Sequence, residues 1–305
     1  MPPTAPLMIR QDSLGRWSAF GAGCFFGINS AVVKLGTLHG VSILTLLLTQ
    51  YGCALVWFGI KSLRTLARDP SDTLRSLLRH RAHWVAGIAS ALTGLLYYAA
   101  IATTRPSIAA LGLFQYPWIL VVLAAVFDRE RVTRRALGVV GLIGIGTILT
   151  LGTTASSLSI LGLILSLFAA GAFATYLWSL QRIVPTPRAQ WLVIGIATVI
   201  TASLGVIHPH LLSPLTAMSL VFGVCSALCG LILTFELLSF AARQIAPTAL
   251  APWTTAELPV AVGLSWILWG PAPHVTQLLG LVLMVGSLVW LQYHAMRSLV
   301  NHSSR

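Results

Sequence analysis

The stretch SIAALGLFQYPWILVVLAAVF at residues 107–127, followed directly by DRERVTRR at 128–135, sets the pattern for the whole chain. The first segment carries no charge and is long enough to cross the hydrocarbon core of a bilayer as a helix, which takes about 20 residues. A basic break behind such a run is typical of the cytoplasmic end of a span. Because lipid offers no partner to backbone polar groups, a helix is the structure expected here.

The same alternation recurs about ten times between Trp17 and Met296. Only 9% of the residues are charged and 56% are hydrophobic, whereas roughly one-quarter of a soluble domain is charged. The sequence therefore predicts an all-α integral membrane protein with ten transmembrane helices. The expected spans are 17–36, 41–61, 84–103, 107–127, 135–152, 159–180, 190–207, 216–241, 248–269 and 275–296.

Basic residues predict how the chain is oriented. If the N-terminus is cytoplasmic, all but two of the 19 Lys and Arg residues fall on the cytoplasmic side, the exceptions being Lys34 and Arg105. Basic loops resist translocation, so we expect cytoplasmic ends at 1–16 and 297–305 and a multi-pass protein of a cell inner membrane or plasma membrane. The net charge of +12 is then explained by lipid headgroups, and no nucleic-acid partner is expected.

Cysteine and histidine do not indicate a metal, a cofactor or a disulfide framework. Cys24, Cys53, Cys225 and Cys229 all fall within expected spans and lack the C-x-x-C spacing. His80 and His83 have no thiolate or carboxylate beside them that would complete a metal site. The chain also lacks a phosphate-cradling G-x-x-x-x-G-K-[ST] loop, so pumping by ATP within this chain is excluded.

An internal repeat becomes visible when the sequence is shifted by 142 positions. Residues 95–149 then align with 237–291 without a gap, and Pro117 meets Pro259, Gly138 meets Gly280 and Gly144 meets Gly286. This predicts two halves of five spans, 17–152 and 159–296. Because five is odd, the halves must cross the membrane in opposite senses, as inverted repeats. The charges of the corresponding loops agree with this inversion. The basic break at 128–135 aligns with GPAPHVTQ at 270–277, which holds no Lys or Arg.

These halves resemble the EamA-type repeats of the drug/metabolite transporter superfamily. Each has a proline-containing helix, a short turn and a Gly-x-x-x-x-x-Gly segment. The sequence VFDRE at 126–130 is similar to a family motif that ends in glutamate. The corresponding sequence in the second half, WGPAP at 269–273, lacks this glutamate. The chain is most similar to the YddG-type exporters of aromatic and other neutral amino acids. The resemblance implies a fold of two inverted five-helix repeats and a transport function.

Two prolines and two polar residues mark the middle of spans. Pro117 and Pro259 each remove a helix hydrogen bond and are candidate hinges, with a packing kink as the alternative. Gln115 and Glu257 lie two residues before them, and the repeat predicts similar depths for both. An ionised carboxylate at a span centre costs at least about 2.5 kcal/mol, so Glu257 needs water, a partner or a proton. A structural hydrogen bond is its alternative role.

Polar and aromatic side chains within the spans predict a cavity for an amphipathic substrate. Besides Gln115 and Glu257, the candidate substrate-binding residues are Asn29, Tyr98, Trp118, Tyr176 and Trp253, with Gln50 as a further lining residue. Amide groups can bind a zwitterionic head while rings contact an apolar side chain. Packing in the bundle or contact with lipid is the alternative role of each ring.

We therefore expect a secondary transporter, monomeric in the bilayer, that exports small neutral or amphipathic metabolites, amino acids above all, by alternating access. A nucleotide-sugar carrier, or another metabolite or drug carrier of the same superfamily, is the nearest alternative. A carrier of nucleotide sugars or sugar phosphates should place Lys or Arg deep in the spans. An enzyme is not expected, because paired aspartates, H-E-x-x-H and Ser/His partners at membrane depth are absent from the sequence. A non-transporting scaffold or receptor subunit is the alternative from another class.

Overall fold

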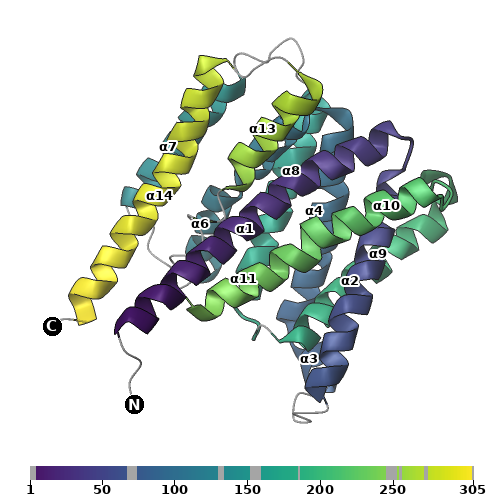
Figure 1. Cartoon of the computed structure of the whole chain (residues 1–305), viewed down its shortest axis with the longest axis horizontal. Coiled ribbons are helices and arrows are strands. Elements are labelled where there is room, and N and C mark those ends of the chain that lie inside the picture. Colours follow the sequence, from purple (N-terminus) through teal and green to yellow (C-terminus); the bar gives the residue numbers. More distant parts are fainter. Residues whose placement is uncertain are drawn as a thin grey trace. The chain divides into compact units, whose positions relative to one another are not determined.

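The computed structural model describes residues 5–66, 74–129, 134–151, 159–184, 186–244, 253, 256–270 and 274–303. Within these ranges the chain is helical and contains no β-strand (Figure 1). The helices are α1 (Ala5–Leu38), α2 (Ile43–Leu66), α3 (Leu74–Arg79), α4 (Arg81–Thr103), α5 (Pro106–Leu113), α6 (Tyr116–Phe127), α7 (Arg134–Leu151), α8 (Ile160–Leu180), α9 (Pro187–Ile207), η2 (Pro209–Leu211), α10 (Ala217–Ser226), the π-helix η3 (Ala227–Ile232), α11 (Leu233–Gln244), α13 (Glu257–Trp269) and α14 (Val275–Ser303).

Among the described residues, seven helical segments are long and apolar enough to cross a membrane, which indicates a multi-pass membrane protein. They are Ser13–Leu38, Ile43–Thr65, Arg81–Thr103, Pro106–Phe127, Ile160–Leu180, Pro187–Ile207 and Ala217–Ala241. These coincide with the first four expected spans and with the sixth to eighth. Shorter apolar helices, Gly141–Thr150, Glu257–Trp269 and Val275–Ser287, lie at the other three. The count of ten spans therefore stays a prediction.

The chain forms two compact units. Unit 1 comprises Met1–Ile28, Thr133–Ser157 and Leu233–Arg305, and unit 2 comprises Asn29–Val132 and Leu158–Ile232. Each unit contains parts of both expected repeats, so the repeats 17–152 and 159–296 also stay a prediction. The chain passes from one unit to the other within the long helix α1, at 28/29, and again at 232/233, where η3 ends.

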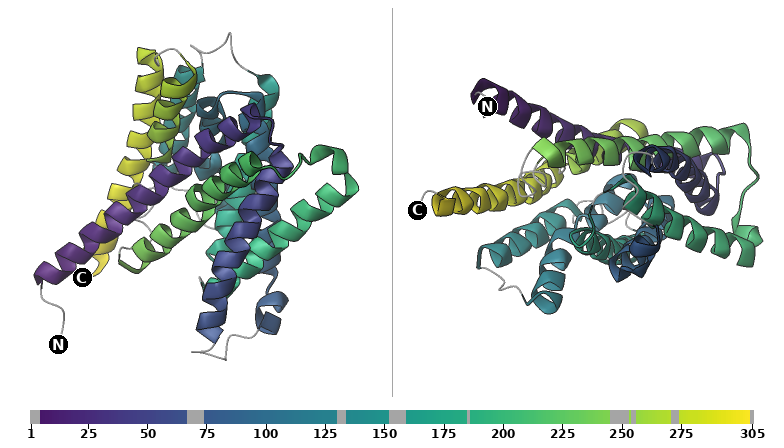
Figure 2. Two further views of the ribbon diagram at one scale, coloured as in Figure 1. Left: turned by 45° about the vertical axis from the view of Figure 1, so that its right-hand side comes forward. Right: turned by 90° about the horizontal axis from the view of Figure 1, so that it is seen from below.

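Unit 2 is built around α4, which packs against both α8 and α9, while α2 packs against α9 and α10 (Figure 2). Small buried residues such as Ala86, Ala89, Ala170 and Ala174 let these helices approach closely. Gly87 is needed for the same reason, because a Cβ there would lie 2.6 Å from the side chain of Ile196.

Lys34 closes the C-terminal end of α4. Its ammonium donates to the carbonyl oxygens of Ile101 at 3.0 Å, Ala102 at 3.1 Å and Thr104 at 2.9 Å. The last carbonyls of a helix have no intrahelical partner and carry a partial negative charge, so a cation stabilises them. All three donor positions of this ammonium are therefore occupied by the backbone.

The end of α6 is tied to the end of α8 by Asp128. The Asp128 carboxylate accepts a hydrogen bond from the Trp178 indole nitrogen at 2.9 Å and forms an ion pair with Arg182. The Arg182 guanidinium also lies 3.6 Å above the centre of the Trp178 ring. The hydrogen bond from Arg182 lowers the pKa of the Asp128 carboxyl, so the pair stays charged at neutral pH and loses its attraction as pH falls through that pKa.

In unit 1, α7 and α14 pack together with their backbones in close contact. A Cβ on Gly280 of α14 would lie 2.5 Å from the carbonyl oxygen of Gly146 in α7, and a Cβ on Gly146 would lie 2.7 Å from the carbonyl oxygen of Gly280. No side chain fits at either position without moving the helices apart.

Replacing Gly280 by alanine should therefore lower the free energy of unfolding by about 1–3 kcal/mol, as overpacking does. Gly286→Ala is the matched control on the same helix, because a Cβ at Gly286 meets no atom within 4 Å. The control should be neutral or stabilise by up to about 1 kcal/mol, the helix propensity gained by Gly→Ala. Thermal unfolding in detergent measures both; equal stability of the two variants would contradict the close packing of α7 and α14.

Candidate functional site

Four buried polar side chains from four helices meet in unit 2. They are Asn29 of α1, Gln50 of α2, Tyr98 of α4 and Ser226, the last residue of α10, and each is at most 4% exposed. We call these four residues the polar cluster. Each of them belongs to a candidate membrane span.

Direct hydrogen bonds join all four members of the polar cluster. The Asn29 amide nitrogen donates to the Tyr98 hydroxyl at 3.1 Å, and the Tyr98 hydroxyl donates to the Gln50 amide oxygen. The Ser226 hydroxyl lies 2.8 Å from the Asn29 amide oxygen, 3.1 Å from that of Gln50 and 2.9 Å from the Tyr98 hydroxyl. Because a serine has one proton, it can donate to only one of these oxygens at a time.

The amide nitrogen of Gln50 is the spare donor of the polar cluster. No hydrogen bond joins this nitrogen to any residue that the structure describes, although the Gln50 amide oxygen accepts from both hydroxyls. Because the one Ser226 proton serves either the Asn29 or the Gln50 amide oxygen, the network keeps an open acceptor position as well as the open Gln50 N–H groups.

The π-helix η3 begins directly after Ser226 and lies against the polar cluster. A Cβ on Gly230 of η3 would lie 2.8 Å from the Asn29 amide nitrogen and 2.9 Å from the Gln50 amide nitrogen. Only glycine lets the backbone come this close to both amides. Short π-helical turns interrupt the regular hydrogen bonds of an α-helix and occur frequently at functional sites.

Aromatic side chains also lie in the helices of unit 2. Tyr51 follows Gln50 in α2, is buried, and donates its hydroxyl hydrogen bond to the Ser90 carbonyl oxygen at 3.1 Å, and Tyr176 of α8 is buried as well. Ring contacts then lead from Tyr176 to Phe173, with centroids 6.1 Å apart, and from Phe173 to Tyr116 of α6, 4.9 Å apart.

Tyr116 begins α6 at a break in the expected span 107–127. Helix α5 ends at Leu113 and α6 starts at Tyr116, which places Pro117 in the first helical turn, where its missing N–H costs little. The sequence predicted a bend within one helix, whereas the structure has two helices. Gln115 lies in the break, and its amide donates to the Leu111 carbonyl at 3.2 Å and accepts from the Trp118 indole at 3.2 Å. Its side chain thus supplies a partner for a backbone group near the break.

Glu257 holds the corresponding position in unit 1. It is the first residue of α13, with Pro259 in the same turn, and is only 7% exposed. Its Oε1 atom makes no hydrogen bond to any part of the chain that the structure describes. The backbone carbonyl of Glu257 lies close to Gly27 of α1, where a Cβ would come within 2.6 Å.

The expected site residues are thus divided between the units. Asn29, Tyr98, Gln115, Trp118 and Tyr176 lie in unit 2, where Asn29 bonds to Tyr98 and Gln115 to Trp118.

Glu257 and Trp253 lie in unit 1, where the Trp253 ring is 6.3 Å from that of Trp17. The expected proximity of Gln115 and Glu257 stays a prediction. The sequence did not predict Ser226 as a site residue, because nothing in the sequence distinguishes it from the other serines in apolar runs.

Comparison with known proteins supports the fold and nothing more specific. No family model matches the chain, and no curated protein matches it. A solved structure described only as the crystal structure of a protein is similar to it with a TM-score of 0.60 and 16% identity, over 94% of this chain and 98% of the other. Nearly the whole chain therefore shares a fold that is already known.

Removing one hydroxyl from the polar cluster should destabilise the protein. Tyr98→Phe and Ser226→Ala each leave buried amide groups without a partner, a loss of about 1–3 kcal/mol in the free energy of unfolding. Tyr51→Phe is the control, since it removes a single bond to one carbonyl and should cost about 0.5–1.5 kcal/mol.

Thermal or denaturant unfolding in detergent measures these differences. The double variant Tyr98→Phe/Ser226→Ala should lose less than the sum of the two single variants, because both hydroxyls belong to one network. Additive losses, each no larger than that of Tyr51→Phe, would show that the four side chains do not act together.

Proposed function

We propose that the chain is a secondary transporter of an inner or plasma membrane, which exports small neutral or amphipathic metabolites, with neutral amino acids, aromatic ones included, as the main substrate class. The observation that carries the proposal is the polar cluster. Hydrogen-bonding groups inside a membrane bundle are expensive, and ionisable or strongly polar ones usually mark a substrate path.

The chemistry of the polar cluster suits a zwitterion. A carboxylate needs donors, and the Gln50 amide nitrogen supplies two N–H groups that no described residue uses. An ammonium needs acceptors, which the amide oxygens of Asn29 and Gln50 provide when the hydroxyls of Ser226 and Tyr98 turn away. The buried rings of Tyr51, Tyr98 and Tyr176 suit an apolar or aromatic side chain.

The position of basic residues favours neutral substrates over nucleotide sugars and sugar phosphates. In the seven candidate spans, each Lys or Arg lies within four residues of a span end. Lys34, one of the innermost of these, already has three carbonyl partners. A carrier of phosphorylated substrates needs a cation that is free at the depth of the site.

Alternating access needs helices that can change course, and the chain offers them beside the polar cluster. Unit 2 begins at Asn29, within α1, and its last segment is η3, which is followed by α11. The chain therefore passes between the two units at residues that belong to the polar cluster or lie against it. The proposal also includes ten spans in two inverted repeats and cytoplasmic termini. In it, Pro117 and Pro259 act as hinges, and Gln115 and Glu257 bind the substrate as further ligands.

Transport by the purified protein in proteoliposomes tests the proposal, with labelled phenylalanine and a panel of neutral amino acids. Gln50→Leu removes the spare donor and should lower kcat/KM at least about tenfold, which one to two hydrogen bonds to a charged group can supply. Gln181→Leu is the matched control, because Gln181 caps α8 outside the polar cluster and is exposed.

Native transport by Gln50→Leu would restrict the polar cluster to a structural role and favour a scaffold or receptor subunit. Failure of the wild-type protein to transport every neutral amino acid of the panel would exclude the proposed substrate class.

A further inference from the structure

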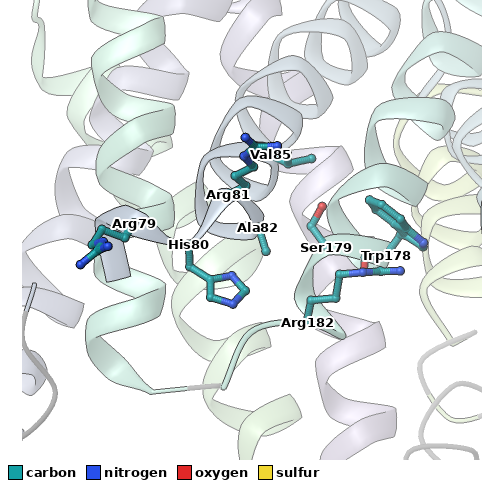
Figure 3. A pocket seen from close by; sticks show the side chains of 8 residues that line it. All are labelled: Arg79, His80, Arg81, Ala82, Val85, Trp178, Ser179 and Arg182. Carbon is teal, nitrogen blue, oxygen red and sulfur yellow. The ribbon is translucent and has the colours of Figure 1, made fainter. Parts of the chain in front are cut away.

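A cavity of about 500 Å³ lies within unit 2, away from the polar cluster, between the start of α4 and the end of α8. Arg79, Arg81 and Arg182 line it, together with His80. In Figure 3, Arg182 and Trp178 stand on the α8 side, and Arg79, His80 and Arg81 on the side of α3 and α4. The charge pattern predicts that this end of unit 2 faces the cytoplasm.

The cavity is electropositive. Among the residues that the structure describes, no Asp or Glu lines it, and Asp128 is already paired with Arg182. Arg79 and Arg81 make no ion pair with any residue that the structure describes, and both are exposed. Neither guanidinium group is therefore neutralised by a described carboxylate, and guanidinium can bind phosphate oxygens with two parallel hydrogen bonds. In Figure 3 the Arg79 and Arg81 side chains point in different directions, so they spread positive charge around the cavity and do not converge on one point.

An apolar stripe leads from the cavity along α4. Val85 lines the cavity, and Ile88 and Leu92 follow on the same helical face, three and seven residues further on. Both Ile88 and Leu92 are 45% exposed, on a segment that is long and apolar enough to span a membrane. Positive charge at the end of a span, continued by an apolar stripe, matches a molecule that has an anionic head and an acyl chain.

We propose that this cavity binds an anionic glycerophospholipid, with its headgroup attracted by the positive charge of Arg79 and Arg81 around the cavity and one acyl chain along Val85, Ile88 and Leu92. Basic pockets on the cytoplasmic side of membrane helices recognise such headgroups. The Trp178 ring, held by Asp128 and Arg182, also lines the cavity, and indole rings favour the membrane interface. The site is independent of the transport path.

Binding of phosphatidylglycerol and of phosphatidylcholine with the same acyl chains, to the delipidated full-length protein in detergent, tests the site by native mass spectrometry. The wild-type protein should bind phosphatidylglycerol preferentially. Arg79→Gln/Arg81→Gln should weaken this binding about thirty-fold, the effect of two unit charges near an anionic headgroup. The phosphatidylcholine affinity should stay within about twofold, since its head carries no net charge.

Arg64→Gln/Arg105→Gln removes the same charge from positions that do not line the cavity and should leave phosphatidylglycerol binding unchanged. Ile88→Ser/Leu92→Ser should weaken phosphatidylglycerol and phosphatidylcholine alike. Displacement of the lipid by millimolar inorganic phosphate would identify a site for free phosphate and overturn the proposal. Equal loss of binding in the two arginine double variants would overturn it as well, since the effect would then come from net charge alone.

Discussion

Hydrogen bonds among Asn29, Gln50, Tyr98 and Ser226 hold four helices of unit 2 at one depth and in one register. In lipid, apolar side chains give little preference for one helix neighbour over another, because acyl chains are as apolar as leucine. A polar side chain does have a strong preference, since an unsatisfied group in hydrocarbon costs several kcal/mol. The register of α1, α2, α4 and α10 therefore depends on these bonds, and the small residues between the helices then allow close packing.

The different locations of neutral polar groups and charged groups follow from the same cost of burying polar groups in hydrocarbon. Neutral amides and hydroxyls occupy the interior of unit 2, where desolvating a charge would be far more expensive. Cations gather at helix ends, where Lys34 stabilises the carbonyls of α4 and Arg182 pairs with Asp128. The arginines around the cavity at the start of α4 follow this rule, and it is their lack of carboxylate partners that suits them to lipid phosphate.

Much of the helical layout could be predicted from the sequence, because span-length apolar runs are a local property. Seven of the expected spans coincide with helices of sufficient length, and Asn29 and Tyr98 could be identified because strongly polar groups are rare in such runs. The break between α5 and α6 and the π-helix η3 could not be predicted. Both depend on tertiary contacts, such as the side chain of Gln115 bonding to Leu111 and the approach of Gly230 to two amides. The role of Ser226 likewise depends on three partners distant in sequence.

The central claim, that the polar cluster binds the substrate head, is tested most directly by the reactivity of a native thiol. Cys229 of η3 directly precedes Gly230, whose backbone lies against the Asn29 and Gln50 amides, and it can be studied alone once Cys24, Cys53 and Cys225 are replaced by alanine. The measurement is its rate of alkylation in proteoliposomes with and without phenylalanine. A substrate at the polar cluster should slow the reaction at least about threefold at concentrations that saturate transport, and Gln50→Leu should abolish this protection. An unchanged rate under saturating transport would contradict the account.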